Sequence, residues 1–377
     1  MSVASVAVAN AGETPTPRPE ALSLTRLPEH NLDILRTIAV LLVVFDHVAE
    51  TLGFHTKFVF WTGQAGVQAF FVHTSLVLMA SLERDGAPAR QSWVRRFYLR
   101  RAFRIYPLAW AIIGLMVVFQ VKAGLTSRET HYTPSLVLVN LAMIQDITGR
   151  DYVLPVLWSL PLEIEMYLVL PLCFVLARSR SAVPMFAMIV AGCALATLST
   201  YGIHDPHRIP SMWRFPVLRF IPCFLMGVLA YWMLRRRVVP RLPSWTWIPI
   251  VLADVWILSY GFLLYPNWVM RALFCVVIGV GIPFVVEAAP SMLTRAAHTI
   301  ATYSYGIYLI HQLALRVGFG VLKGQAVAVQ LLVSAVVLTV GCYAAYHLVE
   351  KPCIDFGRRL LGERGRVASL EATAPPP

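Results

Sequence analysis

The sequence predicts an all-α fold: a polytopic membrane protein with about ten transmembrane helices. Two features of its composition point there. Hydrophobic residues make up 58% of the 377 residues, and charged residues only 14%, whereas soluble domains average about 45–50% and about 25%. The third feature is a series of apolar runs of about 15–24 residues, long enough to span a bilayer core as helices. These features exclude an ordinary soluble enzyme, a disordered chain and a disulfide scaffold.

Ten apolar runs follow one another along the chain, and each predicts one spanning helix. In order they are residues 32–52, 63–82, 107–121, 156–177, 183–200, 219–234, 245–264, 268–286, 300–317 and 325–348. An eleventh run, 135–147, is short for a span, and we expect it to be re-entrant or interfacial. Around a membrane domain at 29–352 we expect a disordered cytoplasmic leader, 1–28, and a largely disordered cytoplasmic tail, 353–377.

The basic residues predict the orientation of the chain. Its net charge is +12, which the inner loops of a membrane protein explain without a nucleic-acid partner. With the N-terminus inside and run 135–147 not crossing, 21 loop or tail Lys and Arg residues lie inside and 7 outside. If that run crosses, the split becomes 13 and 15. The positive-inside rule therefore predicts cytoplasmic termini and a multi-pass protein of the cell (inner) membrane.

The first apolar run carries ionisable residues, which are costly in lipid and usually face a cavity or a partner. Arg36 and His47 are eleven residues apart, so they share a helix face at a separation of about 16 Å. Asp33 is placed to pair with Arg36 one turn away. The alternative is an interfacial histidine at a helix end with a snorkelling arginine beside it.

The segment FYLRRAFRIYP, residues 97–107, is a basic cluster that leads into the third run. Arg101 and Arg104 project from one helix face. Guanidinium groups bind phosphate oxygens in pairs, so the cluster suits a polyanionic phosphate ligand. The alternative is a topology determinant that touches lipid headgroups.

Two further segments carry candidate residues. In WSLPLEIEMYLVLP, residues 158–171, Glu163 and Glu165 point about 200° apart, and by parity they lie at the same outer end as His47. A carboxylate beside that imidazole would fix its tautomer, although helix-terminal acids are the simpler alternative. In YSYGIYLIHQ, residues 303–312, His311 shares a stripe with Tyr308 and Ser304. A packing role for His311 is the alternative there.

Taken together, these segments resemble the acyltransferase-3 family of integral membrane O-acyltransferases. Six of its motifs occur in order between about residues 31 and 352. They are LDxLRxxA with a following histidine (Leu32, Asp33, Leu35, Arg36, Ala39, His47), GVxxFFxxSG (66–75), RxxRIxP (Arg101, Arg104, Ile105, Pro107), WSLxxExxFYLxxP (Trp158, Ser159, Leu160, Glu163, Tyr167, Pro171), SYxxYLxH (304–311) and ExP (Glu350, Pro352). Thr74, Ser75 and Met166 depart from the pattern, and Ser75 replaces a glycine that would allow close helix packing.

The resemblance implies transfer of an acyl group, acetyl as the expected one, from acyl-CoA to a hydroxyl of a carbohydrate or glycolipid acceptor. It selects Glu163 over Glu165, and it implies that Arg101 and Arg104 bind the CoA phosphates. His47 would act as general base, oriented by Glu163. The remaining residues of interest would line or support the path: Arg36, Asp33, Trp158, Tyr167 and His311.

The predicted mechanism and the predicted function each have one alternative, and the mechanism also bears on the need for a cofactor. A covalent acyl-histidine relay competes with direct transfer. A thioester carries its own activation, so we expect no metal and no permanently bound cofactor. The alternative from another functional class is a transporter or channel for an anionic or sugar-like solute, which also explains intramembrane charge.

Overall fold

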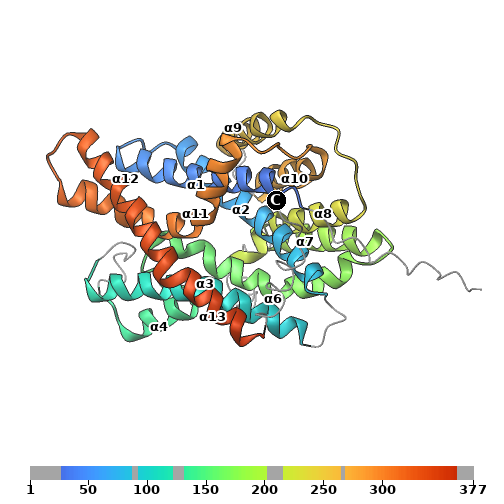
Figure 1. Cartoon of the computed structure of the whole chain (residues 1–377), viewed down its shortest axis with the longest axis horizontal. Coiled ribbons are helices and arrows are strands. Elements are labelled where there is room, and N and C mark those ends of the chain that lie inside the picture. The colour runs from blue at the N-terminus through green and yellow to red at the C-terminus, as the bar shows by residue number, and fades with distance from the viewer. Residues whose placement is uncertain (1–26, 87–91, 122–130, 202–214, 265–267, 363–377) are drawn as a thin grey trace, which may run out of the picture.

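The computed structural model describes residues 27–86, 92–121, 131–201, 215–264 and 268–362 (Figure 1). Within them the chain is helical, with one isolated parallel bridge between Leu242 and Val285 and no sheet. The long helices are α1 (Glu29–Thr51), α2 (Lys57–Arg84), α3 (Trp93–Val118), α6 (Ser159–Ala177), α7 (Val183–Tyr201), α8 (Ile221–Arg235), α9 (Trp247–Leu264), α10 (Trp268–Phe284), α11 (Met292–Arg316) and α12 (Val327–Ala344). Each predicted apolar run corresponds to one of them, which confirms the all-α class.

Five helical segments are long and apolar enough to cross a membrane. They are Lys57–Arg84, Trp93–Val118, Pro155–Ala177, Val183–Thr200 and Val327–Leu360. Two shorter apolar helices, α8 and α10, accompany them. The outer helices expose large apolar side chains, such as Leu168 and Leu172 on α6 and Val336 and Val340 on α12, as lipid-facing surfaces do. The chain is thus a membrane protein by its helices, while the count of ten spans and the cytoplasmic termini stay predictions.

The eleventh run folds into two short helices, α4 (Pro134–Ala142) and α5 (Gln145–Thr148). Nine residues of α-helix extend about 13 Å, well short of the roughly 30 Å hydrocarbon core. The buried side chain of Asn140 ties the segment to the chain that follows it, because it donates to the Asp151 carbonyl at 3.0 Å and accepts from the Val153 amide at 2.9 Å. The run therefore does not cross as a single helix, as its length predicts.

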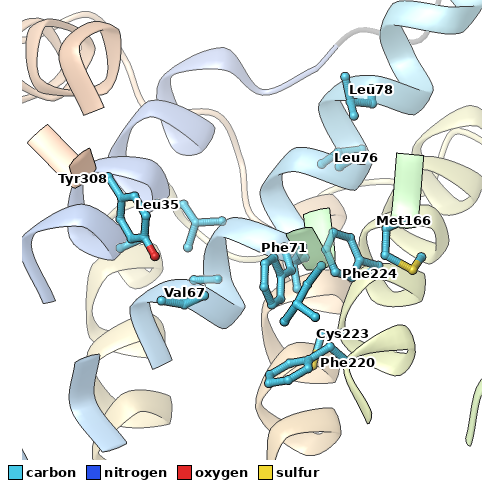
Figure 2. Packing of buried hydrophobic residues seen from close by; sticks show 14 of the residues in the cluster. Leu35, Val67, Phe71, Leu76, Leu78, Met166, Phe220, Cys223, Phe224 and Tyr308 are labelled. Atoms are coloured by element: carbon cyan, nitrogen blue, oxygen red, sulfur yellow. The ribbon is translucent and has the colours of Figure 1, made fainter. Parts of the chain in front are cut away.

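Helix α2 is the centre of the bundle, where it packs against α1, α8 and α9. Figure 2 shows its inward face, on which the Phe71 ring stacks against Phe224 of α8 with ring centroids 4.4 Å apart. Helix α8 approaches α2 closely at Gly227, where a Cβ would overlap the Ser75 side chain and the Val72 carbonyl oxygen. Ser75 stands where the family pattern has glycine, so here the partner helix supplies the glycine that permits the close approach.

The C-terminal part of the described chain differs from the predicted tail. A π-helical turn, η6 (Ala345–Glu350), leads from α12 into α13 (Lys351–Leu360), so regular helix continues past the predicted tail start at 353. Helix α13 packs on α3, with Gly357 against Phe103. The Arg96 guanidinium donates to the Leu361 carbonyl at 2.7 Å, which fixes the end of α13. Residues 1–26 and 363–377 of the predicted leader and tail lie outside the described residues.

Several ion pairs gather at the C-terminal end of α2, which we call the basic end. Glu83 lies 3.7 Å from Arg178 and 3.2 Å from Arg235, so it joins the ends of α6 and α8. Asp85 pairs with Arg100 of α3. The opposite end of α2 begins at Lys57, about 42 Å away at the rise of an α-helix.

Candidate active site

Two cavities follow one another along the axes of α1, α2 and α11. The larger, the His47 cavity, has a volume of about 1030 Å³ and its lining includes Asp46, His47, Glu50, Lys57, Val67, Val156, Trp158, Tyr308, Gln312 and Arg316. The smaller, the arginine cavity, has a volume of about 110 Å³ and its lining includes Arg36, Val67, His73, Arg101, Arg104, Ser159, Glu163, Tyr167, Ser304, Tyr305 and Tyr308. Each of these three helices contributes to both cavities, whereas residues 155–158 line only the larger cavity and α6 lines only the smaller one.

The sequence order along each helix shows how the cavities are stacked. On α2, residues from Lys57 to Val67 line the His47 cavity, and residues from Val67 to Leu78 line the arginine cavity. The arginine cavity therefore lies nearer the basic end. Helix α1 places Arg36 and His47 in different cavities, as expected for residues about 16 Å apart along one helix.

The His47 imidazole is held by residues of α1 and α11. Its Nδ1 lies 3.2 Å from Oε2 of Glu50, one turn further along α1. The Gln312 amide nitrogen lies 3.2 Å from Nε2, and the His311 ring stacks on the imidazole at a centroid distance of 5.0 Å. About 22% of the His47 side chain is exposed, so the ring is positioned by neighbours and yet reachable from the cavity.

Charges of both signs surround this imidazole in the His47 cavity. Asp46 lies next to His47 on α1, and its carboxylate covers Gly63 of α2, where any Cβ would collide with it. Lys57 and Arg316 contribute positive charge to other walls of the cavity. The cavity thus contains a histidine that contacts a carboxylate, and its walls are aromatic and charged. This composition is typical of a site for a polar ligand.

The arginine cavity gathers three guanidinium groups. Arg36 donates from Nε to the Ser304 hydroxyl at 2.6 Å. The Tyr167 hydroxyl donates to the Glu163 carboxylate one turn earlier on α6, and Arg104 pairs with Glu350. The Nε atom of Arg101 is buried and makes no hydrogen bond among the described residues. Three guanidiniums against two carboxylates leave one positive charge, which favours an anionic ligand.

Glu350 pairs from the π-helical turn η6 with Arg104, which lines the cavity, and only 1% of the Glu350 side chain is exposed. π-helical turns often occur at functional positions because they shift side chains out of the α-helical register. Glu350 belongs to the ExP motif, for which the sequence alone predicts no role. An acid that directly follows an apolar run was the sequence signal that could have suggested a partner for Arg104.

Two residues, Val67 and Tyr308, line both cavities and so lie at their boundary. The Tyr308 hydroxyl donates to the Val156 carbonyl at 2.8 Å and lies 2.7 Å from the Ser159 hydroxyl. Those two residues belong to the 3₁₀ turn η1 (Pro155–Trp158) and to the start of α6. The boundary therefore joins α11 to the point where the chain changes from 3₁₀ to α-helix.

The structure brings together part of the predicted site. Arg36, Arg101, Arg104, Glu163 and Tyr167 line one cavity. His47 and Trp158 line the other, and His311 stacks on His47 without lining either cavity.

The expected contact between His47 and Glu163 does not form, because α6 begins only after the 3₁₀ turn and carries Glu163 past the boundary into the arginine cavity. The carboxylate in contact with His47 is instead Glu50, an i,i+3 neighbour that the sequence analysis missed. That spacing was the available signal.

Two other expectations concerning acidic residues are settled by contacts. Asp33 does not hydrogen-bond to Arg36; its carboxylate lies 2.8 Å from Nδ1 of His298 on α11. Glu165 faces away from both cavities and interacts with the carboxyl group of Asp146 on α5. All four oxygens of these two carboxyl groups are buried. Of the two candidate glutamates on α6, Glu163 is therefore the one that faces a cavity.

Comparison with known proteins places this arrangement in context. The sequence model of a family described as "Acyltransferase domain" matches residues 29–347. "Nodulation protein 10" from Rhizobium leguminosarum bv. viciae is 24% identical, over 90% of this chain and 97% of that protein. "Putative acetyltransferase ORF330" from Acidianus two-tailed virus is also 24% identical, over 78% of this chain and 86% of that protein. No solved structure matches the chain.

Proposed function

The chain belongs to the acyltransferase-3 family and is an acyltransferase, and we propose that it transfers an acyl group, acetyl in the first instance, from acyl-CoA to a hydroxyl of a carbohydrate or glycolipid. The observation that carries this proposal is the stacking of a cationic cavity on a histidine cavity, with Val67 and Tyr308 lining both of them. Membership in an acyltransferase family favours an enzyme over the alternative of a solute transporter.

The arginine cavity is the proposed donor site. Coenzyme A carries several phosphate charges, and Arg101 and Arg104 offer guanidinium groups that bind phosphate oxygens. At about 110 Å³ the cavity is much smaller than a whole acyl-CoA. Only one part of the donor can therefore lie inside it, and the rest would extend toward the basic end, where further arginines lie.

The His47 cavity is the proposed acceptor site. Its volume of about 1030 Å³ suits a sugar-sized ligand, and Trp158 and charged side chains supply the mixed apolar and polar walls that such ligands need. An acceptor held there would have a hydroxyl within reach of the His47 imidazole. The carbohydrate class rests on this composition and on the family resemblance.

The proposed chemistry is direct transfer. His47 takes the proton of the acceptor hydroxyl, and the hydroxyl oxygen forms a bond to the thioester carbonyl carbon. The C–S bond then breaks, and the proton passes to the departing CoA sulfur. Glu50 would hold the His47 ring in place, a role the sequence analysis gave to Glu163. Glu163 would instead shape the donor site among Arg36 and Arg101. In the competing relay, His47 itself carries the acyl group, which would show as a trapped acyl-enzyme and ping-pong kinetics.

Acetyl-CoA binding and turnover test the proposal with full-length purified protein. The His47→Ala variant should still bind labelled acetyl-CoA but lose transfer by roughly 100-fold to 10,000-fold. The Arg101→Ala and Arg104→Ala variants should lose binding itself. Tyr98→Phe is a matched control, since Tyr98 lines neither cavity and bonds only the Leu168 carbonyl. Full transfer activity in His47→Ala would contradict the mechanism.

A second experiment identifies the acceptor. Mass spectrometry of surface glycans and lipids from a deletion strain should reveal one species that lacks an acyl group. The missing mass would name the acyl group, and the species that lacks it would name the acceptor. A complete and unchanged acylation pattern on every glycan and lipid would contradict the carbohydrate or glycolipid class.

A further inference from the structure

The boundary between the two cavities is built around one tyrosine side chain. Tyr308 is only 6% exposed, and it lines the arginine cavity on one side and the His47 cavity on the other. Figure 2 labels it together with Val67 of α2, the other residue that lines both cavities. On the far side, its ring centroid lies 6.3 Å from that of His311, which in turn stacks on His47.

Two hydrogen bonds hold the ring across the boundary. The Tyr308 hydroxyl donates to the Val156 carbonyl at 2.8 Å, and the Ser159 hydroxyl lies 2.7 Å from it. Val156 also lines the His47 cavity. An acceptor that fills this cavity would therefore press on the same turn whose carbonyl fixes Tyr308. Buried hydroxyl groups that are fully hydrogen-bonded resist displacement, because each lost bond leaves an unpaired polar atom.

The separation matters because the His47 cavity admits water. The imidazole is partly exposed, and a general base that activates a sugar hydroxyl also activates a water molecule. If the thioester shared that cavity before the acceptor arrived, the water oxygen would bond to the carbonyl carbon and the C–S bond would break. The products would be a free carboxylate and CoA thiol, and the donor would be wasted.

We propose that Tyr308 is the barrier that selects acyl transfer over hydrolysis, because it keeps the donor thioester away from His47 and its water until an acceptor fills the larger cavity. This inference rests on the proposed function, since it assumes an acyl-CoA in the arginine cavity. Tyr308 acts here as a positioning and specificity residue, and it moves no proton in the transfer step.

Hydrolysis of acetyl-CoA without any acceptor tests the barrier directly. The assay measures thiol release in full-length wild type, Tyr308→Phe and Tyr308→Ala, with calorimetry to measure acetyl-CoA binding. Tyr308→Phe keeps the ring and loses both hydrogen bonds, so its acceptor-independent hydrolysis should rise roughly tenfold. Tyr308→Ala should hydrolyse faster still. The rise should vanish in the His47→Ala, Tyr308→Phe double variant, which a merely loosened fold would not explain.

The controls separate the possible failures. Tyr98→Phe also removes a tyrosine hydroxyl but lines neither cavity, and it should hydrolyse at the wild-type rate. If Tyr308→Ala does not fold, Tyr308→Phe and Ser159→Ala decide the question. Wild-type hydrolysis rates in variants that still bind acetyl-CoA would overturn the barrier and leave the proposed function standing. Failure of the wild type to bind acetyl-CoA would overturn the proposed function as well.

Discussion

The His47 imidazole takes its carboxylate partner from its own helix. Glu50 lies one turn away with 3.2 Å between Oε2 and Nδ1, whereas Glu163 lies in the other cavity. A short-range pair of this kind keeps its geometry whenever α1 is intact, because it does not depend on how two helices dock. We therefore expect Glu50 to control the orientation of the His47 imidazole.

Substitution by glutamine, at Glu50 or at Glu163, should distinguish the roles of these two carboxylates. Glu50→Gln should lower the turnover number by about tenfold and leave acetyl-CoA binding unchanged. The loss should be smaller than in His47→Ala, because the Glu50 side chain is 59% exposed and water replaces part of the interaction. Glu163→Gln should instead weaken acetyl-CoA binding. Steady-state kinetics check both, with the exposed Glu29→Gln as control. The reverse pattern would restore Glu163 as the partner of His47.

The second residue-scale prediction concerns the acid behind Arg104. Glu350 is buried, and its removal frees a guanidinium that it holds in place. Glu350→Gln should raise the KM for acetyl-CoA by roughly fivefold to tenfold with a smaller effect on the turnover number. Glu350→Asp should recover part of the loss. Asp355→Asn is the matched control, because Asp355 lies on α13 and pairs only with Arg358. If the turnover number and the affinity for acetyl-CoA fell equally, and the protein were also less stable, Glu350 would have a purely structural role.

Helix by helix, most of the fold could be predicted from the sequence. Runs of apolar residues this long admit few conformations in a membrane, so each became a helix. Spacing also placed Arg101 and Arg104 on one face, and both line the arginine cavity. Spacing within a helix does not give the depth at which one helix meets another. The turn η1 precedes α6, and Glu163 lines the arginine cavity rather than the His47 cavity, so the structure does not show the expected contact between Glu163 and His47.

Contacts between helices also explain why one departure from the family pattern is tolerated. The glycine expected on α2 is replaced by Ser75, and Gly227 on α8 provides the close approach. Gly227→Ala should destabilise the protein by about 1–3 kcal/mol, because the new methyl group would meet the Val72 backbone, which cannot rotate away. Gly114→Ala on α3 is the control, since nothing lies within 4 Å of its Cβ position. There the better helix propensity of alanine should stabilise by up to about 1 kcal/mol.

Thermal unfolding in detergent measures both glycine variants. The Gly227→Ala midpoint should fall by several degrees, and the yield of folded protein should fall with it. The Gly114→Ala midpoint should stay level or rise. An unchanged midpoint in Gly227→Ala would mean that α2 and α8 pack less closely than their contact at Gly227 indicates.

Across the whole molecule, the two cavities and the basic residues are arranged along the axis of α2. The arginine cavity lies toward the basic end, where Arg178 and Arg235 pair with Glu83, and the His47 cavity lies toward Lys57 at the other end of α2. Because basic residues favour the cytoplasmic side, this polarity predicts that the donor enters from inside and the acceptor from outside. The predicted sidedness thus gives each cavity the substrate that its charge suits.

Cysteine labelling from one side of the membrane tests that orientation. In a background with the two partly exposed cysteines, Cys193 and Cys353, replaced by serine, Lys57→Cys should react with an impermeant maleimide on intact cells. Arg359→Cys should react only after the cells are opened, because its end of α13 is tied to the basic end through Arg96. Both positions are exposed, so access alone decides the result.

The labelling also decides between the two span counts. If run 135–147 crossed the membrane, the chain would have eleven spans, and ten of them would separate Lys57 from Arg359. With the N-terminus inside, both positions would then face outward, and both cysteines would react on intact cells. Such a result would contradict the ten-span count. It would also be hard to reconcile with helix α4, whose nine residues extend only about 13 Å. Labelling of Lys57→Cys alone would instead support ten spans and an outward-facing His47 cavity.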